Sequence, residues 1–256
     1  MSPAMSSTDP TRLTPTTPPE PLPALLAFGA HPDDLEFGCG GVLANEARHG
    51  RPVHLVVCSR GESASHGTPE IRAGEAAAAA RLLGATLEFL ELDGDAHLEI
   101  RAAHALTLAA VIRRVRPGLI LAPSLGENQH PDHHRLGRLI RDAARLARYG
   151  GVAELRGQPA HAIQALFYYA ITTEAEPADL SPLLVDVSDP AVLTAWTAAM
   201  AAHASQVTAR NYVDLQVTRA RLLGLRAGVS HAQALYPNDP PLLGSLAQLG
   251  ASARRF

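Results

Sequence analysis

Two short stretches of the sequence bring histidines and carboxylates together. Residues 30–34 read Ala-His-Pro-Asp-Asp, and residues 130–134 read His-Pro-Asp-His-His. In the first stretch two adjacent carboxylates lie beside an imidazole, and they repel each other unless a positive charge neutralises them. A divalent metal ion would supply that charge, so the two stretches indicate a metal centre.

An apolar run precedes each stretch. Residues 25–29 (Leu-Leu-Ala-Phe-Gly) lead into the first, and residues 119–123 (Leu-Ile-Leu-Ala-Pro) come shortly before the second. We interpret residues 25–29 and 119–122 of these runs as buried parallel strands, and ligands of open α/β sheets bind just beyond the carboxyl ends of strands. The two stretches can therefore face one crevice, although they lie far apart in the sequence.

Imidazole and carboxylate ligands suit zinc, which in catalytic sites keeps one position open for water. His31 and Asp34 can turn toward one point across a tight loop. His133 lies one turn after His130 at the start of a predicted helix, so the two imidazoles share a face. If His31, Asp34 and His133 are the ligands, Asp33 is left as a general base for a metal-bound water.

His130 is left over in this assignment as well. It is positioned to donate a proton or to stabilise an oxyanion, and Asp132 could hold its ring nitrogen and keep it protonated. The alternative is structural, because a single His-Pro-Asp stretch is usually a turn with a capping Asp. Two such stretches, each after a strand-like run, make coincidence a poorer explanation.

A Gly-rich segment follows the first stretch, with glycines at positions 38, 40 and 41. We interpret it as a turn that leads into a helix over residues 42–49. It is an incomplete dinucleotide-binding pattern, and the acidic residues ahead of it would repel a pyrophosphate. A nucleotide-binding module without catalysis is therefore the less favoured interpretation. Cys39 within it is expected to be a small buried filler.

Apolar runs alternate with longer amphipathic segments through the rest of the chain. The pattern predicts an α/β fold: a Rossmann-like, doubly wound, mostly parallel sheet with helices on both faces. Beyond the two strands above, the predicted strands cover residues 53–58, 87–90, 165–169 and 183–187, and the predicted helices cover residues 69–83, 100–115, 131–149, 190–203 and 215–227.

Composition sets the domain organisation. The chain has 256 residues, of which 46% are hydrophobic and 18% are charged, as expected of a globular enzyme. Residues 1–23 are rich in Ser, Thr and Pro and are predicted to be a disordered tail. Residues 24–256 are predicted to form one domain, in which the part from about residue 151 completes the sheet and covers the site.

Charge and cysteine content exclude several classes of partner. The net charge is −3 and no basic block occurs, which argues against nucleic-acid binding. No stretch reaches the length of a membrane helix, and the start of the chain lacks the features of a signal peptide. The two cysteines, Cys39 and Cys58, make a disulfide framework improbable, so we expect a reducing, cytoplasmic location.

The two histidine stretches resemble those of the LmbE/PIG-L family of zinc-dependent de-N-acetylases, and the likeness extends over about residues 25–236. Residues 59–62, 67–72 and 92–94 narrow it toward the deacetylases of bacillithiol biosynthesis. The resemblance implies an LmbE-like fold, zinc (with Fe²⁺ as an alternative) and a homo-oligomer, either a dimer or a hexamer. It also implies roles for individual residues: His31, Asp34 and His133 as ligands, Asp33 as base, His130 as acid or electrostatic partner oriented by Asp132, Arg72 in contact with substrate, and His203 near the oxyanion.

The predicted function is hydrolysis of a linear amide: removal of the N-acetyl group from an N-acetylglucosamine glycoside. Arg60 and Arg72 flank the loop after the second strand, and an arginine fork suits a carboxylate. They favour an anionic aglycone, with N-acetylglucosaminyl malate as the predicted substrate. Surface ion pairs with Glu62 and Glu75 are the alternative for these arginines. Another N-acetylated sugar or a small amide is the alternative substrate.

Overall fold

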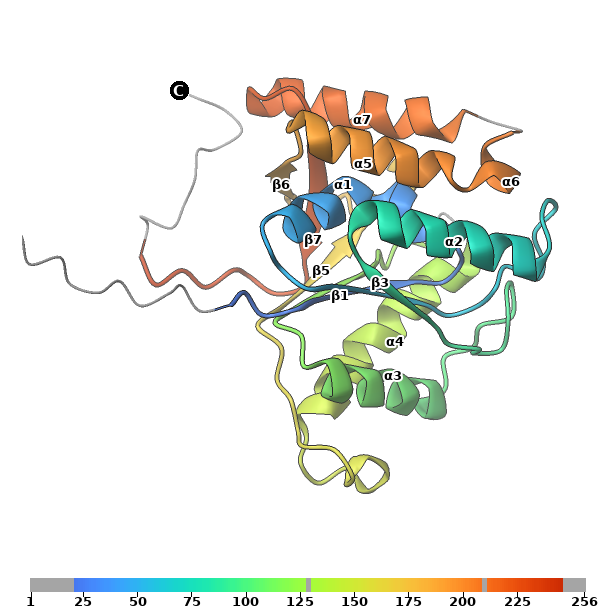
Figure 1. The fold of residues 1–256 in the computed structure, drawn as a ribbon. Helices are drawn as coiled ribbons and strands as arrows, with labels where there is room; N and C mark the ends of the chain where they lie inside the picture. The colour runs from blue at the N-terminus through green and yellow to red at the C-terminus, as the bar shows by residue number, and fades with distance from the viewer. Residues whose placement is uncertain (1–20, 128–129, 209–210, 246–256) are drawn as a thin grey trace, which may run out of the picture.

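The computed structural model describes residues 21–127, 130–208 and 211–245. A seven-stranded sheet with helices on both faces confirms the predicted fold class (Figure 1). The predicted tail, residues 1–23, lies almost entirely outside the described residues. The strands are β1 (Leu25–Gly29), β2 (Val53–Val57), β3 (Thr86–Phe89), β4 (Leu119–Pro123), β5 (Ala165–Tyr169), β6 (Leu183–Asp186) and β7 (Ala232–Pro237). The helices are α1 (Asp34–Arg48), α2 (Pro69–Leu83), α3 (Ala102–Val115), α4 (Pro131–Arg148), α5 (Pro190–Ala201), α6 (Ala204–Val207) and α7 (Tyr212–Ala227), with short 3₁₀ turns at Ala153–Leu155 and Thr173–Ala175.

The strand order is β3-β2-β1-β4-β5-β7-β6, and the first five strands in that order are parallel. The order reverses direction between β1 and β4, which are neighbours in the sheet but not in sequence. This reversal is the topological switch point, where open α/β sheets form a crevice outside the carboxyl ends of their strands. The loops that follow β1 and β4 carry the two histidine stretches, so the topology brings them to one place.

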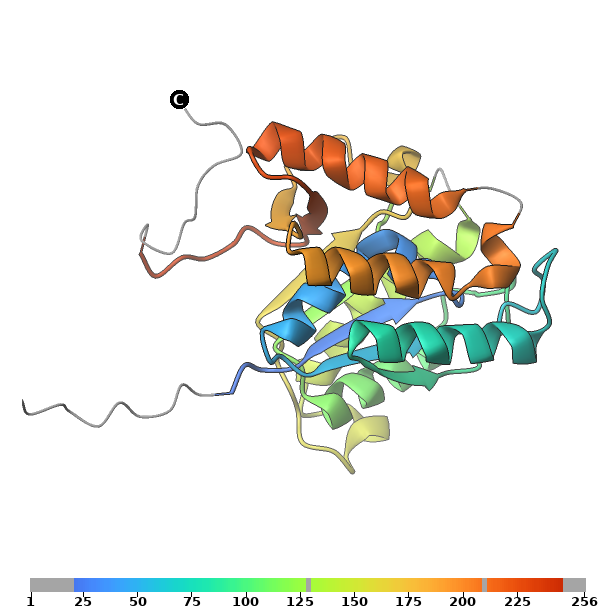
Figure 2. The same cartoon turned by 45° about the horizontal axis from the view of Figure 1, so that its top comes forward.

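Two layers of helices cover the sheet. Figure 1 shows α3 and α4 on one face and α1, α2, α5 and α7 on the other, and the turned view of Figure 2 shows α5 and α7 lying over α1. One apolar core lies between the sheet and the α3/α4 layer, and a second lies between the sheet and the α1/α2/α5 layer. Burial on both faces explains why β1 and β4 are apolar runs rather than alternating ones.

The first helix differs from the prediction. It begins at Asp34, directly after the histidine stretch, and is kinked at Cys39 (φ −148°, ψ 16°). The expected Gly-rich turn therefore lies inside the helix. Two side chains form hydrogen bonds with backbone groups on either side of the kink. Trp196 Nε1 donates to the Glu36 carbonyl (2.7 Å), and Gln233 Oε1 accepts from the Val42 N–H (2.8 Å).

The glycines of this helix are explained by close packing. A Cβ atom on Gly38 would overlap the ring of Tyr169, and one on Gly40 would lie 2.6 Å from Cδ1 of Trp196. Both aromatic side chains are fully buried. The glycines thus allow β5 and α5 to approach α1, and they do not form a phosphate-binding turn.

Two elements of the C-terminal part were not predicted from the sequence. Strand β7 inserts between β5 and β6 and is antiparallel to both, so it completes the sheet. The four-residue helix α6 follows α5 and is too short for a periodic signal. Among the helices of the described residues, none is long and apolar enough to cross a bilayer.

Replacing Gly38 by Ala tests the packing of α1. The added methyl group would meet the Tyr169 ring, so we expect Gly38→Ala to lower the free energy of unfolding by about 1–3 kcal/mol, the usual cost of overpacking. The measurement is a urea denaturation midpoint at unchanged slope. The matched control is Gly74→Ala in α2, where a Cβ atom meets nothing within 4 Å; it should be neutral or stabilising. Equal effects of the two substitutions would contradict the packing explanation.

Candidate metal centre and active site

The residues of the first histidine stretch turn sharply between β1 and α1. Asp33, the N-cap of α1, has a left-handed backbone (φ 106°, ψ −25°), which is rare for a residue with a side chain. Asp34 folds back on the turn, and its Oδ2 accepts hydrogen bonds from the Ala30 N–H (2.8 Å) and the His31 N–H (2.9 Å). Non-glycine residues held in such conformations cluster at functional sites. The strained turn sends the Asp33 and Asp34 side chains toward different neighbours.

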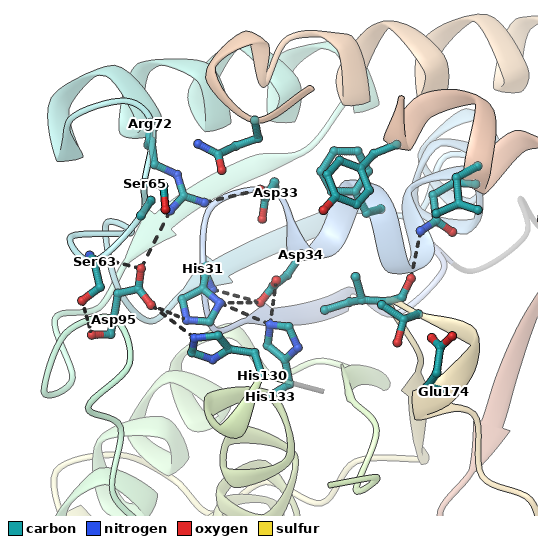
Figure 3. Close-up of a pocket in the computed structure, with 18 of the residues that line it drawn as sticks. His31, Asp33, Asp34, Ser63, Ser65, Arg72, Asp95, His130, His133 and Glu174 are labelled. Atoms are coloured by element: carbon teal, nitrogen blue, oxygen red, sulfur yellow. Dashed lines mark hydrogen bonds and ion pairs between the residues drawn. The ribbon is translucent and has the colours of Figure 1, made fainter. Parts of the chain in front are cut away.

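Ligand-type atoms of three residues from the two stretches converge. His133 Nε2 lies 3.0 Å from Asp34 Oδ1 and 3.2 Å from His31 Nδ1, and His31 Nδ1 lies 3.6 Å from Asp34 Oδ2. A tetrahedral zinc ion with bonds of about 2.0–2.1 Å keeps its ligand atoms roughly 3.3 Å apart. The three predicted ligands therefore fit a divalent ion in donor type and in spacing. Figure 3 shows the three side chains pointing toward one another.

The second nitrogen of His31 is held by carboxylates. His31 Nε2 lies 3.0 Å from Asp95 Oδ1 and 3.3 Å from Asp132 Oδ2. Metal-binding histidines commonly donate their other ring N–H to a carboxylate, which fixes the tautomer and directs the free nitrogen to the ion. These contacts orient Nδ1 of His31 toward Asp34 and His133.

Charge is concentrated at this point, and the pKa values reflect it. Burial disfavours a charged His31, but Asp34, Asp132 and Asp95 outweigh burial and raise the pKa of His31 well above its usual value. Burial disfavours a charged Asp34 as well, but His133 and His31 hold the pKa of Asp34 well below its usual value. Without a metal ion, the cluster therefore favours ionised carboxylates next to protonated imidazole.

Asp33 lies beside the three convergent residues. Burial and the neighbouring Asp34 charge raise the pKa of Asp33 to about 7. Arg72 of α2 approaches its carboxylate at 3.3 Å and also donates to the Pro32 carbonyl (2.7 Å). Asp33 is thus a carboxylate poised to exchange a proton near neutral pH, next to a candidate metal centre.

His130 and Asp132 come from the start of α4. The His130 ring lies edge-on to that of His31, with 4.5 Å between centroids, and burial together with the other two imidazoles lowers its pKa. Asp132 Oδ2 lies 4.0 Å from His130 Nδ1, farther than from His31, and it accepts a hydrogen bond from the Ala96 N–H (2.7 Å). Asp132 therefore contacts His31 more closely than His130, the ring that the sequence assigned to it.

Two residues singled out from the sequence do not reach the cavity. Arg60 is exposed, pairs with Glu91 at 2.9 Å and stacks over the Phe89 ring. His203 is completely buried, and its Nε2 lies 3.3 Å from Glu36 Oε2 in an ion pair rather than a well-aligned hydrogen bond. Burial lowers the pKa of His203, but Glu36 and nearby carboxylates raise it overall.

The centre lies at one side of a cavity of about 710 Å³. Sequence analysis missed Asp95, which follows β3 at the same edge of the sheet as the two histidine stretches. Its position just beyond a predicted strand is the one sequence feature that could have indicated it. It also missed the wall opposite the histidines, which comes from α1, the segment after β5, α6 and α7. The described lining consists of His31, Asp33, Asp34, Phe37, Ser63, Ala64, Ser65, Arg72, Asp95, Ala96, His130, His133, Ile171, Thr172, Thr173, Glu174, Gln206, Tyr212, Leu215, Gln216 and Arg219.

Comparison with known proteins places this site in a family. A family model described as PIG-L, GlcNAc-PI de-N-acetylase, matches residues 26–144, the segment that carries both histidine stretches. A 1D-myo-inositol 2-acetamido-2-deoxy-alpha-D-glucopyranoside deacetylase of Nocardioides sp. is 30% identical over 255 residues, with 72% of this chain and 83% of the relative covered.

Relatives that are named for a different activity also match this chain. A 4-oxalmesaconate hydratase of Pseudomonas putida is 33% identical over 143 residues, covering 51% of this chain and 55% of the relative. The chain thus spans about half the length of some curated relatives that it matches.

A solved structure supports the same grouping. A conserved protein of Thermus thermophilus superposes with a TM-score of 0.79 at 32% identity, covering 90% of this chain and 100% of the other. The chain belongs to the PIG-L/LmbE family.

Proposed function

We propose that this chain is a metal-dependent hydrolase that removes the N-acetyl group from an N-acetylglucosamine-type sugar. The observation that carries the proposal is the meeting of His31, Asp34 and His133 at 3.0–3.6 Å beside Asp33, in a cavity of a size that takes a small molecule. Family membership supports the reaction class, because the family model is described by a de-N-acetylase activity.

His31, Asp34 and His133 would hold the metal, and their two nitrogens and one oxygen suit zinc, with Fe²⁺ as an alternative. When bound, such an ion lowers the pKa of a water molecule and polarises the amide carbonyl. Asp132 and Asp95 contact the other nitrogen of His31 and would keep its ring in place.

Asp33 is proposed as the general base. Its carboxylate lines the cavity but is not one of the three proposed ligand groups. Its pKa of about 7 allows it to accept a proton from water near neutral pH. The ion pair with Arg72 would fix its position. Arg72 would act on substrate mainly through this contact, since its guanidinium is already bonded to protein groups.

His130 is proposed as the acid or the oxyanion partner. Its ring lines the cavity beside His31 and is partly exposed, so it can reach a bound amide. Asp132 lies 4.0 Å from His130 Nδ1 and would stabilise the His130 imidazolium, which would pass its proton to the leaving amine and become neutral. His203, enclosed behind the cavity wall, would stabilise the first turn of α1 through Glu36 rather than touch the oxyanion.

The malate glycoside of bacillithiol biosynthesis is less well supported as the substrate than another N-acetylated sugar. It depended on Arg60 and Arg72 as a carboxylate fork, but Arg60 lies outside the cavity and Arg72 is paired with Asp33. The relatives are named for activities on an inositol-linked glycoside and on oxalmesaconate. Another N-acetylated sugar therefore fits these observations better than the malate glycoside.

A metal assay tests the proposed centre. Purified protein should bind about one divalent ion per chain, and His133→Ala should abolish both metal binding and activity because a ligand is lost. Metal content by mass spectrometry is the measurement, and the control His49→Ala, exposed and outside the cavity, should keep its metal. Full activity of wild type after exhaustive chelation would overturn the metal assignment.

The two adjacent carboxylates should behave differently when each is replaced by an amide. Asp33→Asn should keep the metal while kcat falls by about 10²–10⁴, the range typical of a general base. Asp34→Asn should lose metal affinity, because an amide is a poorer ligand than a carboxylate. Metal titration alongside kinetics distinguishes them, and the reverse pattern would exchange the two roles.

The reaction class is tested by acetate release from N-acetylglucosamine, N,N′-diacetylchitobiose and N-acetylglucosaminyl malate, with N-butylacetamide as a simple amide. We expect release from at least one sugar at a kcat/KM well above that for the simple amide. 4-Oxalmesaconate is included because a relative is named as its hydratase. Hydration of that compound without acetate release from any sugar would replace the deacetylase proposal.

A further inference from the structure

The cavity has two unlike sides. The inner side is the histidine and carboxylate cluster around His31. The outer side, formed by α1, the segment after β5, α6 and α7, includes Phe37, Ile171, Glu174, Tyr212, Leu215 and Arg219. Figure 3 shows Glu174 at the far end of the view from Arg72 and Asp95. The cavity therefore leaves a separate surface for the remainder of a sugar substrate whose acetamido group lies at the cluster.

That outer surface offers apolar contacts. The rings of Phe37 and Tyr212 are 5.5 Å apart at their centroids and tilted by 44°. Leu215, one helical turn further along α7, is 42% exposed although it lines the cavity, and Ile171 lies on the same wall. Aromatic and aliphatic side chains that line a cavity are the usual contacts of an apolar ligand group.

The arginine nearest to the cluster is committed to protein groups. Arg72 is 4% exposed. Its terminal nitrogens donate to the carbonyls of Pro32 and Gly61 and approach the carboxylates of Asp33 (3.3 Å) and Asp95 (3.9 Å). The guanidinium occupies the space that a side chain on Gly61 would need. Its charge is therefore already matched by carboxylates.

The arginine of the outer wall is committed in the same way. Arg219 pairs with Glu176 through Nε at 2.9 Å and through Nη2, and its Nη1 donates to the Ala170 carbonyl at 2.9 Å. The chain contains no lysine. Among the lining residues that the structure describes, these two arginines are the permanent cations, and neither presents an unmatched charge to a ligand.

We infer that the C1 substituent of the substrate is an uncharged, apolar group, such as an aryl or alkyl aglycone, that lies against Phe37, Tyr212 and Leu215. This inference rests on the proposed deacetylase function. Among the described lining residues, an anionic aglycone placed there would find no arginine with an unmatched charge, so it would lose water without gaining a cation. An apolar group gains from the same removal from water.

The test compares kcat/KM, by acetate release, for phenyl N-acetylglucosaminide (both anomers), free N-acetylglucosamine and N-acetylglucosaminyl malate. We expect at least one phenyl glycoside to exceed the free sugar by about tenfold or more, and the malate glycoside not to exceed it. A kcat/KM for the malate glycoside equal to or above that of both phenyl anomers would overturn the inference.

Two variants of α7 locate the effect. Leu215→Arg should reduce the ratio of phenyl glycoside to free sugar and raise the ratio of malate glycoside to free sugar. The matched control is Leu222→Arg on the same helix, 60% exposed and outside the cavity lining, which should leave both ratios unchanged. Equal responses of the two variants would also overturn the inference.

Calorimetric titration of the same compounds into the purified protein separates this inference from the proposed function. Tighter binding of a phenyl glycoside than of the malate glycoside supports the apolar subsite even when no acetate is released, in which case only the deacetylase proposal fails. Acetate release with equal affinities for all of these compounds would support the deacetylase proposal and overturn the apolar subsite.

Discussion

The structure depends on an electrostatic constraint at the point where β1 and β4 lie side by side. Four carboxylates, those of Asp33, Asp34, Asp95 and Asp132, lie around the His31 ring or next to it. Carboxylates so close together in a buried setting repel one another and are stable only when each has a positive or hydrogen-bonding partner. Imidazoles, backbone N–H groups and Arg72 are the partners that the described residues supply, and the proposed metal ion would add a further positive charge.

The local backbone divides these partners among the carboxylates. The left-handed conformation of Asp33 separates its side chain from that of Asp34, although the residues are adjacent. Asp34 turns inward to two backbone N–H groups and His133, whereas Asp33 turns to Arg72. His133 and His31 lower the pKa of Asp34, whereas burial and the neighbouring Asp34 charge raise the pKa of Asp33 and outweigh the opposing effect of Arg72. Pairs of carboxylates with divergent pKa values are characteristic of sites that divide ligand and proton-transfer roles.

The C-terminal part of the chain is joined to this centre through α1. Tyr169, Trp196 and Gln233 come from β5, α5 and β7, and each packs against a glycine of α1. The Trp196 indole and the Gln233 amide also bond backbone groups near the kink at Cys39. Helix α1 starts at a proposed metal ligand, so β5, α5 and β7 support the turn that holds Asp34 although they do not line the cavity.

The sequence by itself determined the fold class, the strands before both histidine stretches, and the meeting of those stretches at one edge of the sheet. Apolar runs buried on both faces and histidines at strand ends are local patterns that one sequence displays.

The tertiary structure decided the rest. The short strand β7 and the contacts of Asp95 depend on partners distant in sequence, and the glycines of α1 are explained only by the aromatic rings that pack against them. Arg60 and Arg72 flank the same loop, yet only Arg72 is buried against the carboxylates. Helix α2 directs Arg72 inward, whereas Arg60 forms an ion pair with Glu91 at the surface. Side-chain direction of this kind is set by packing, which spacing along the chain does not encode.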